Sequence, residues 1–135
     1  MKLGEELDQR LRTGTVDATD GHRSVRADVA DADRLAVSLR RLRVHTPGRT
    51  VAEAVATLPE AVGRALGAPL EVVEVAPTLG GAVIRGRPDG DREYWEVRTT
   101  GEAAELERWR VHADGREAVA FPLTRRDLRR LVEGM

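Results

Sequence analysis

The second half of the sequence is divided by turn residues into five short runs that are rich in β-branched and aromatic side chains. Runs of this length bounded by Gly, Pro and Asp are typical of strands joined by hairpins. The predicted strands are residues 70–75, 82–85, 93–99, 104–111 and 118–123, and the predicted turns are residues 77–81, 87–90, 101 and 114–115. Because hairpins join antiparallel neighbours, this half of the chain predicts a mostly antiparallel sheet.

Two rules disagree about the last hairpin. Asp114-Gly115 is a favoured dipeptide for a two-residue turn. Matching the apolar faces of the two strands instead places Trp109 opposite Phe121 and needs a three-residue loop, 114–116. Because burial decides the register of a strand pair, we expect the three-residue loop.

The N-terminal segment predicts a short helix. Leu3, Leu7 and Leu11 are spaced by four residues and form one narrow apolar face. A helix this short needs a surface to dock on, and we expect the protein's own sheet, with a neighbouring molecule as the alternative. The polar residues up to Gly21 are rich in turn formers, so residues 1–21 are expected to form a helix and a linker with freedom to move.

Two further runs have a period of two, which indicates half-buried strands. In residues 24–29 valine and alanine alternate with polar side chains, and residues 35–44 continue this pattern. The apolar parity changes in the middle of the second run, and a β-bulge at Arg40-Arg41 would reconcile the two halves. A helix over the second run is the alternative.

Residues 50–67 predict the longest helix. Thr50 and Glu53 have the spacing of a capping box, in which each side chain satisfies a free backbone amide of the other residue. Gly67 is a natural C-terminal stop. Pro59 lies inside the apolar stripe and removes one helical hydrogen bond, so we expect a kink or two short helices there.

The last helix begins after Thr124, a favourable N-terminal cap. Leu123 and Leu128 have the spacing of a hydrophobic staple, and Leu128, Leu131 and Val132 form the stripe to be buried. Residues 1–135 are therefore expected to form a single α+β domain. It has a mostly antiparallel sheet of about five to seven strands, a short N-terminal helix, and a kinked central helix and a C-terminal helix packed on the sheet.

Charge in this chain is balanced, and almost all of its basic residues are arginine. Twenty-one of the 22 Lys and Arg residues are arginine, against 23 acidic residues, so the formal net charge is -1. An overall positive field is absent, and nucleic acid is not an expected partner. The chain has no cysteine, residues 1–6 lack the apolar run of a signal peptide, and no apolar run approaches the roughly 20 residues that span a bilayer. We therefore expect a cytoplasmic protein without membrane contact.

Four arginines crowd the predicted last helix: Arg125, Arg126, Arg129 and Arg130. They lie off the apolar stripe, so all four are expected to reach solvent. Guanidinium groups pair with carboxylates and phosphates, which makes these residues candidates for binding an acidic partner. The alternative is a solvated helix face in an arginine-rich chain. A second basic cluster occupies residues 40–43.

Tyr94 and Trp95 are the other candidate binding residues. They are adjacent in a predicted strand, so they point to opposite faces of the sheet. One is expected in the core and the other exposed or half-covered, where an aromatic ring can anchor a partner. Packing of both beneath a helix is the more common fate.

The sequence predicts no catalytic residue, metal site or cofactor. His22, His45 and His112 are scattered and have no paired ligand spacing. The acidic clusters around Asp31 and Asp89 lack the pattern of a calcium-binding loop and are interpreted as turns. No two carboxylates stand out as an acid and a base.

The strand Tyr94-Trp95-Glu96, followed by a basic strand and then by Phe121-Pro122-Leu123-Thr124-Arg125, resembles the C-terminal half of small uncharacterised bacterial proteins. These proteins carry a similar aromatic-aromatic-Glu run and a Pro-Phe-x-Leu-Thr-Arg start to the last helix. The resemblance covers roughly a third of the chain. It implies an α+β fold and no particular activity, since none is assigned to those proteins.

The absence of concentrated chemistry favours a non-enzymatic protein-interaction module, such as an adaptor, a chaperone-like accessory or a small assembly component. An antiparallel sheet with an open edge is a template for strand addition, so we expect a protein partner, acidic if it meets the arginines, and a homodimer. The alternative is an enzyme or small-ligand-binding protein whose pocket lies between the helices and the sheet. Nucleic-acid binding through the arginine-rich last helix is third.

Overall fold

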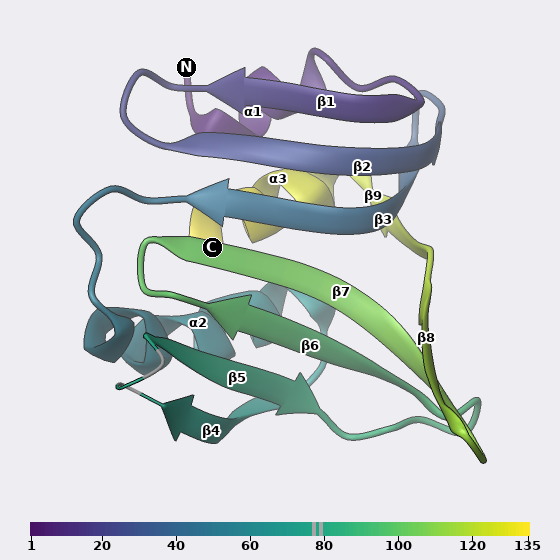
Figure 1. Cartoon of the computed structure of the whole chain (residues 1–135). Helices are drawn as coiled ribbons and strands as arrows, with labels where there is room; N and C mark the ends of the chain where they lie inside the picture. The colour runs from purple at the N-terminus through teal and green to yellow at the C-terminus, as the bar shows by residue number, and fades with distance from the viewer. Residues whose placement is uncertain (77, 79) are drawn as a thin grey trace.

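The computed structural model describes residues 1–76, 78 and 80–135, which form nine strands and three helices (Figure 1). The strands are β1 (Gly14–Thr19), β2 (Ser24–Ala32), β3 (Ala36–His45), β4 (Leu70–Ala76), β5 (Gly81–Gly86), β6 (Glu93–Thr99), β7 (Ala103–His112), β8 (Gly115–Val119) and β9 (Phe121–Thr124). The helices are α1 (Leu3–Asp8), α2 (Val51–Leu66) and α3 (Arg125–Gly134). Of the turn predicted at 77–81, Pro77 and Leu79 lie outside the described residues.

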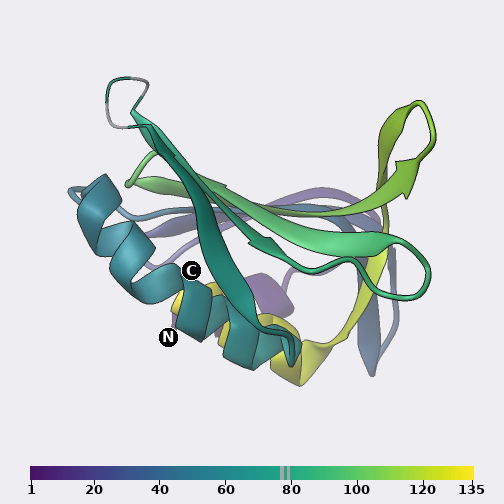
Figure 2. The ribbon, with the colours of Figure 1, turned by 90° about the horizontal axis from the view of Figure 1, so that it is seen from below.

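All nine strands belong to one antiparallel sheet. Its neighbours follow the order β1-β2-β3-β7-β6-β5-β4, with β8 also beside β7 and β9 also beside β3. The α+β class and the antiparallel sheet are confirmed, but the sheet has more strands than the five to seven expected. The three helices lie on one face of the sheet, and among the described residues no helix covers the other, which we call the open face (Figures 1 and 2).

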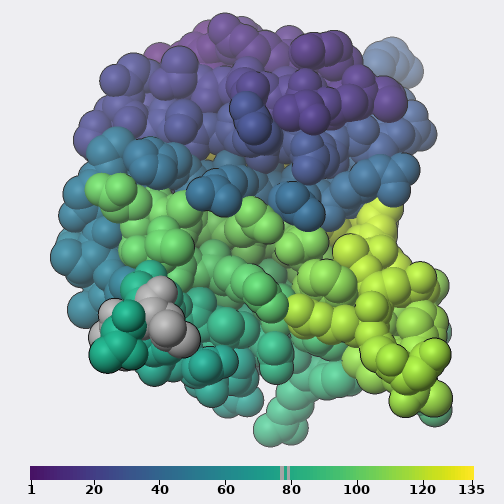
Figure 3. All heavy atoms as spheres, viewed as in Figure 1, coloured from purple at the N-terminus to yellow at the C-terminus, as the bar shows by residue number. Residues whose placement is uncertain are grey.

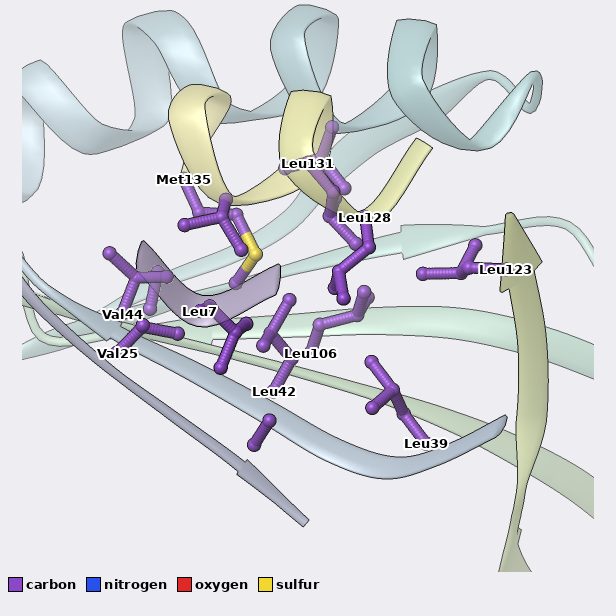
Figure 4. Close-up of a cluster of buried hydrophobic side chains, with 14 of the residues drawn as sticks. Leu7, Val25, Leu39, Leu42, Val44, Leu106, Leu123, Leu128, Leu131 and Met135 are labelled. Carbon is purple, nitrogen blue, oxygen red and sulfur yellow. The ribbon is translucent and has the colours of Figure 1, made fainter. Parts of the chain in front are cut away.

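The hydrophobic core lies between the helices and the sheet. Leu7 of α1 and Leu128 and Leu131 of α3 meet Leu42 of β3 and Leu106 of β7 there, and all five are fully buried (Figure 4). Burying a leucine stabilises the fold by about 1.5–3 kcal/mol relative to leaving it exposed. The core therefore fixes α1 and α3 on the centre of the sheet.

The linker predicted within residues 1–21 is wrong, because the segment contains a strand. β1 pairs antiparallel with β2 along its whole length. Its buried residues, Val16 and Ala18, alternate with polar ones, a period-two pattern too short to be read against its turn-rich surroundings. The expected docking of α1 on its own molecule is confirmed, since Leu3 and Leu7 are fully buried and α1 contacts α3 and β1.

The bulge expected in the second alternating run is present. Arg41 pairs with Asp28 and Leu39 with Val29, so Arg40 is the extra residue of β3. The extra residue lets Val37 and Leu39 face the helices on one side of the bulge while Leu42 does so on the other. The run is therefore a strand, as expected, and not a helix.

Helix α2 begins and ends as predicted. Thr50 and Glu53 form the full capping box, and Gly67 has a left-handed backbone conformation with φ of 66° at the C-terminal cap. The helix is continuous from Val51 to Leu66 with Pro59 inside it, so the alternative of two short helices is wrong.

The register expected for the last hairpin is wrong. The turn has two residues, Ala113 and Asp114, and Trp109 lies opposite Ala118. Phe121 belongs to β9, which pairs with β3 instead of β7. The prediction assumed that residues 118–123 form one strand beside β7. Instead, β8 pairs with β7 and the next strand, β9, pairs with β3.

The start of α3 confirms the expected cap. The Thr124 hydroxyl accepts a hydrogen bond of 3.0 Å from the backbone amide of Asp127. Leu128, Leu131 and Val132 are fully buried, as the apolar stripe predicts. This orientation turns the four arginines of α3 away from the core.

Candidate functional site

The four arginines of α3 divide into two pairs with different surroundings. Arg125 Nε lies 2.9 Å from Asp8 Oδ1, and Arg125 also donates a hydrogen bond of 3.0 Å to the carbonyl oxygen of Asp8. Arg129 Nη1 donates to Asp8 Oδ2 over 2.8 Å. Arg125 and Arg129 therefore hold the end of α1, although their side chains remain 27% and 40% exposed.

Arg126 and Arg130 are exposed, and within the described ranges neither makes an ion pair. Together with Lys2 and Arg129 they line a depression of about 420 Å³ that also contains Glu5 and Glu133. The outward half of the helix therefore remains a small basic surface.

The second basic cluster does not meet the first. Arg41 lies 3.5 Å from Glu105 and 3.7 Å from Glu107, and Arg43 lies 3.3 Å from Glu105. These side chains stand on the open face, because Leu42 and Leu106 between them face the helices. Helix α3 lies on the opposite side of the sheet (Figure 2).

Tyr94 and Trp95 point to opposite faces, as expected, but neither is an exposed anchor. Trp95 lies on the helix side and contacts Phe121 edge to face, with 5.0 Å between ring centroids. Tyr94 lies on the open face and is 9% exposed. It is covered there by Arg85, whose guanidinium lies 5.8 Å from the ring centroid, and by Arg116, which donates a hydrogen bond of 2.7 Å to its hydroxyl.

The open face carries a buried carboxylate that no feature of the sequence indicated. The side chain of Glu96 is 1% exposed and contacts three guanidinium groups: Arg85 at 2.7 Å, Arg98 at 3.2 Å and Arg116 at 3.0 Å. Arg116 comes from β8, whose hairpin bends toward the open face (Figure 2). Because the partners come from three strands, only the folded sheet brings this cluster together.

Two opposed carboxylates of the open face have pKa values displaced in opposite directions. Burial alone would raise the pKa of Glu96, but hydrogen bonds and charge from Arg116 and Arg85 outweigh it and lower the pKa. Burial raises the pKa of Glu107, its cross-strand neighbour, against the opposing charge of Arg41. Such a pair can serve acid–base chemistry. Here three arginines cover the Glu96 carboxylate and leave it 1% exposed, so the cluster is better explained as structural.

The histidines lie apart from one another. His112 Nε2 lies 2.8 Å from Glu117, and His45 lies 3.6 Å from Glu102, both on the surface. His45 also lines a depression of about 450 Å³ along β1, β2 and β3. The space between the helices and the sheet, where an enzyme's pocket was the alternative expectation, is occupied by the hydrophobic core (Figure 4).

The most exposed apolar side chains of the sheet lie on β4. Val72, Val73 and Val75 are 37%, 48% and 49% exposed. In the described part of the chain β4 has a strand neighbour on one side only, so its other edge carries unpaired backbone groups. The teal region of β4 and β5 lies at the rim of the open face (Figure 3).

Two glutamates share this edge. Glu71 and Glu74 are exposed, and neither makes an ion pair with any described residue. Arg85 is the cross-strand neighbour of Glu71, but it is engaged by Glu96. The β4 edge, which we define as residues 70–76, therefore combines half-exposed valines with uncompensated negative charge.

The opposite edge of the sheet is different. In β1 the apolar residues Val16 and Ala18 are buried beneath α1, and Asp17 pairs with Arg26 at 2.8 Å. Its outward side chains are polar. Within the described residues, β4 is therefore the one edge strand that presents large apolar side chains to solvent.

No protein-family model, curated protein or solved structure matches the chain. Among the described residues no helix has both the length and the apolar character needed to cross a membrane. Those residues also bring together no group of three or more His, Asp or Glu side chains able to hold a metal ion.

Proposed function

We propose that the protein is a non-enzymatic, cytoplasmic protein-interaction module that binds an extended segment of a partner along the β4 edge. An adaptor, a chaperone-like accessory and a small assembly component all use such a contact. The observation that carries this proposal is the half-exposure of three valines on a strand with one described neighbour. An added strand would pair the free backbone groups and cover the valines.

The surroundings of β4 support strand addition. Val72 and Val75 lie opposite Ile84 and Ala82, which are buried, so these two valines face the helix side. A depression of about 600 Å³, lined by residues of α2 and by the segment leading into Leu70, continues the edge there. A partner strand could therefore bury apolar side chains against α2 as well as against β4.

A second contact for an acidic partner is proposed at Arg126 and Arg130. Both are exposed and make no ion pair with the described residues, and Lys2 adds a third positive charge beside them. Arginine binds carboxylates through two parallel hydrogen bonds, which suits an acidic peptide. This surface is separate from the β4 edge and can be tested by itself.

Co-purification from the native host tests the proposal. Tagged wild-type protein is compared with Val73→Asp, which places a charge where an added strand would bury it. Val111→Asp is the matched control, because Val111 is an exposed valine on β7 with an exposure of 36%. A partner retained by wild type and Val111→Asp and lost by Val73→Asp is expected. Absence of any protein partner, together with a small molecule that raises the melting temperature by several degrees, would overturn the proposal.

A further inference from the structure

We propose that the β4 edge accepts a basic strand of another protein. The inference rests on the proposed function and adds the chemistry of the partner. It follows from the positions of Glu71 and Glu74 relative to the bulge in β4.

The bulge sets which side chains of β4 share a face. Glu71 lies opposite Arg85 and Glu74 opposite Val83, so both glutamates stand on the open face. They are three positions apart in β4 but oppose residues two positions apart in β5, because Val73 is the extra residue of a β-bulge. A regular strand therefore meets the two glutamates with two residues of the same face.

If a second copy of the chain pairs with this edge, both β4 strands carry the bulge at Val73. Antiparallel pairing over residues 70–75 of both copies places Leu70 against Val75, Val72 against Val73 and Glu71 against Glu74. A shift of one residue in either direction opposes a glutamate to a helix-side residue, Val75 or Leu70, and so mismatches the faces. The unshifted register therefore opposes two pairs of glutamates directly. A shift of two residues, with Val72 against Val75, Glu71 against Ala76 and Val73 against Glu74, also matches the faces and opposes no glutamates.

Like charges directly opposite each other destabilise a strand pair. No described arginine makes an ion pair with these carboxylates. Arg85, opposite Glu71, lies 2.7 Å from Glu96, and Arg98, which lines the same depression as Glu74, lies 3.2 Å from Glu96. The two glutamates therefore disfavour the register that opposes them, and they leave negative charge on the exposed edge.

The same carboxylates favour a partner of the opposite charge. In a partner strand whose faces match those of β4, a basic residue lies opposite Glu71 and another opposite Glu74. The residue between them is apolar and lies against the valines. On the inner side β5 provides a basic residue opposite Glu71, Arg85, but only the apolar Val83 opposite Glu74. The occupant assigned to the edge is an extended basic-apolar-basic segment.

Two synthetic peptides test this assignment with the purified full chain. They are identical except that one has Lys-Val-Lys at its centre and the other Glu-Val-Glu. At low salt we expect the lysine peptide to bind wild-type protein at least about ten-fold more tightly than the glutamate peptide. The double variant Glu71→Lys/Glu74→Lys should reverse this preference, and salt should reduce it in both proteins.

Amide chemical shifts locate the binding, and sedimentation measures self-association. Shifts confined to β4, β5 and the facing side of α2 are expected. Sedimentation of the wild type tests whether a second copy occupies the edge instead. Glu71→Gln/Glu74→Gln should bind both peptides with equal affinity, which separates charge from any effect on folding.

Three results would overturn the inference. Equal binding of both peptides at β4 would refute the role of charge and leave strand addition intact. A wild-type dimer that Val73→Asp abolishes would show that the occupant is a second copy. Failure of the lysine peptide to shift the amides of β4 would refute the basic segment, while the co-purification experiment would still decide separately whether β4 binds a partner.

Discussion

Arg129 donates a hydrogen bond of 2.8 Å to Asp8, which joins the last helix of the chain to the first. Arg125 approaches the other oxygen of the same carboxylate at 2.9 Å. Two arginines of α3 thus make ion pairs within the molecule, whereas Arg126 and Arg130 are exposed and make no ion pair with any described residue.

Replacing Asp8 with Ala should destabilise the protein by roughly 1–3 kcal/mol, since Arg129 loses its carboxylate acceptor and Arg125 keeps only the backbone carbonyl of residue 8. Urea unfolding followed by circular dichroism measures this change. The double reversal Arg126→Glu/Arg130→Glu is the control and should change the free energy of unfolding by no more than about 0.5 kcal/mol. Equal losses in both variants would show that the two pairs of arginines are not distinct.

Glu96→Gln should destabilise the protein at neutral pH by about 2–3 kcal/mol, because three arginines lose the charge that they surround. The lowered pKa of Glu96 means that the folded state binds its proton less tightly than the unfolded chain. The stabilisation is therefore present above the ordinary carboxyl pKa of about 4.3 and is lost as the pH falls below it. Unfolding curves across this range should show wild type and variant converging in acid, and a constant difference would contradict the assignment.

Glu107→Gln should have the opposite sign. Burial raises the pKa of Glu107, so its ionised form opposes folding at neutral pH. The variant should be as stable as wild type or more stable by up to about 1 kcal/mol at pH 7. That advantage should disappear as the pH falls through the raised pKa to the ordinary one, because the wild-type side chain is then neutral. A clear loss of stability at pH 7 would show that the ion pair with Arg41 outweighs burial.

Leu128→Ala should cost roughly 2–5 kcal/mol of unfolding free energy, since Leu128 is fully buried between α3 and the sheet (Figure 4). Leu35→Ala is the matched control, because Leu35 is 78% exposed. Its replacement should change stability by less than about 0.5 kcal/mol. Similar melting temperatures for the two variants would contradict the position of the core.

Sequence patterns correctly predicted those features that depend only on residues a few positions apart. The capping box of Thr50 and Glu53, the cap at Thr124 and the bulge at Arg40 all depend on neighbours in sequence, and all three are present. Strand β1 was missed because Val16 and Ala18 give too few apolar positions to reveal a period of two.

Relationships between distant segments could not be predicted. The cluster at Glu96 draws arginines from β5, β6 and β8, and the pairing of Phe121 with β3 required knowledge that the chain changes neighbours after β8. The sequence contains the valines of residues 72–75, but it does not indicate that their strand lies at the end of the sheet. Edge position is a property of topology, and it is what makes β4 a candidate site.

Site-specific photocrosslinking in the native host tests the central claim most directly. A photoreactive amino acid replaces Val73 at the centre of the β4 edge in one variant and Val111 in the other, both exposed valines. We predict a covalent adduct with another protein at position 73 and none at position 111, with the adduct mapping to an extended segment of the partner. Equal adducts at both positions, or adducts at position 111 alone, would show that the β4 edge is not the interaction surface.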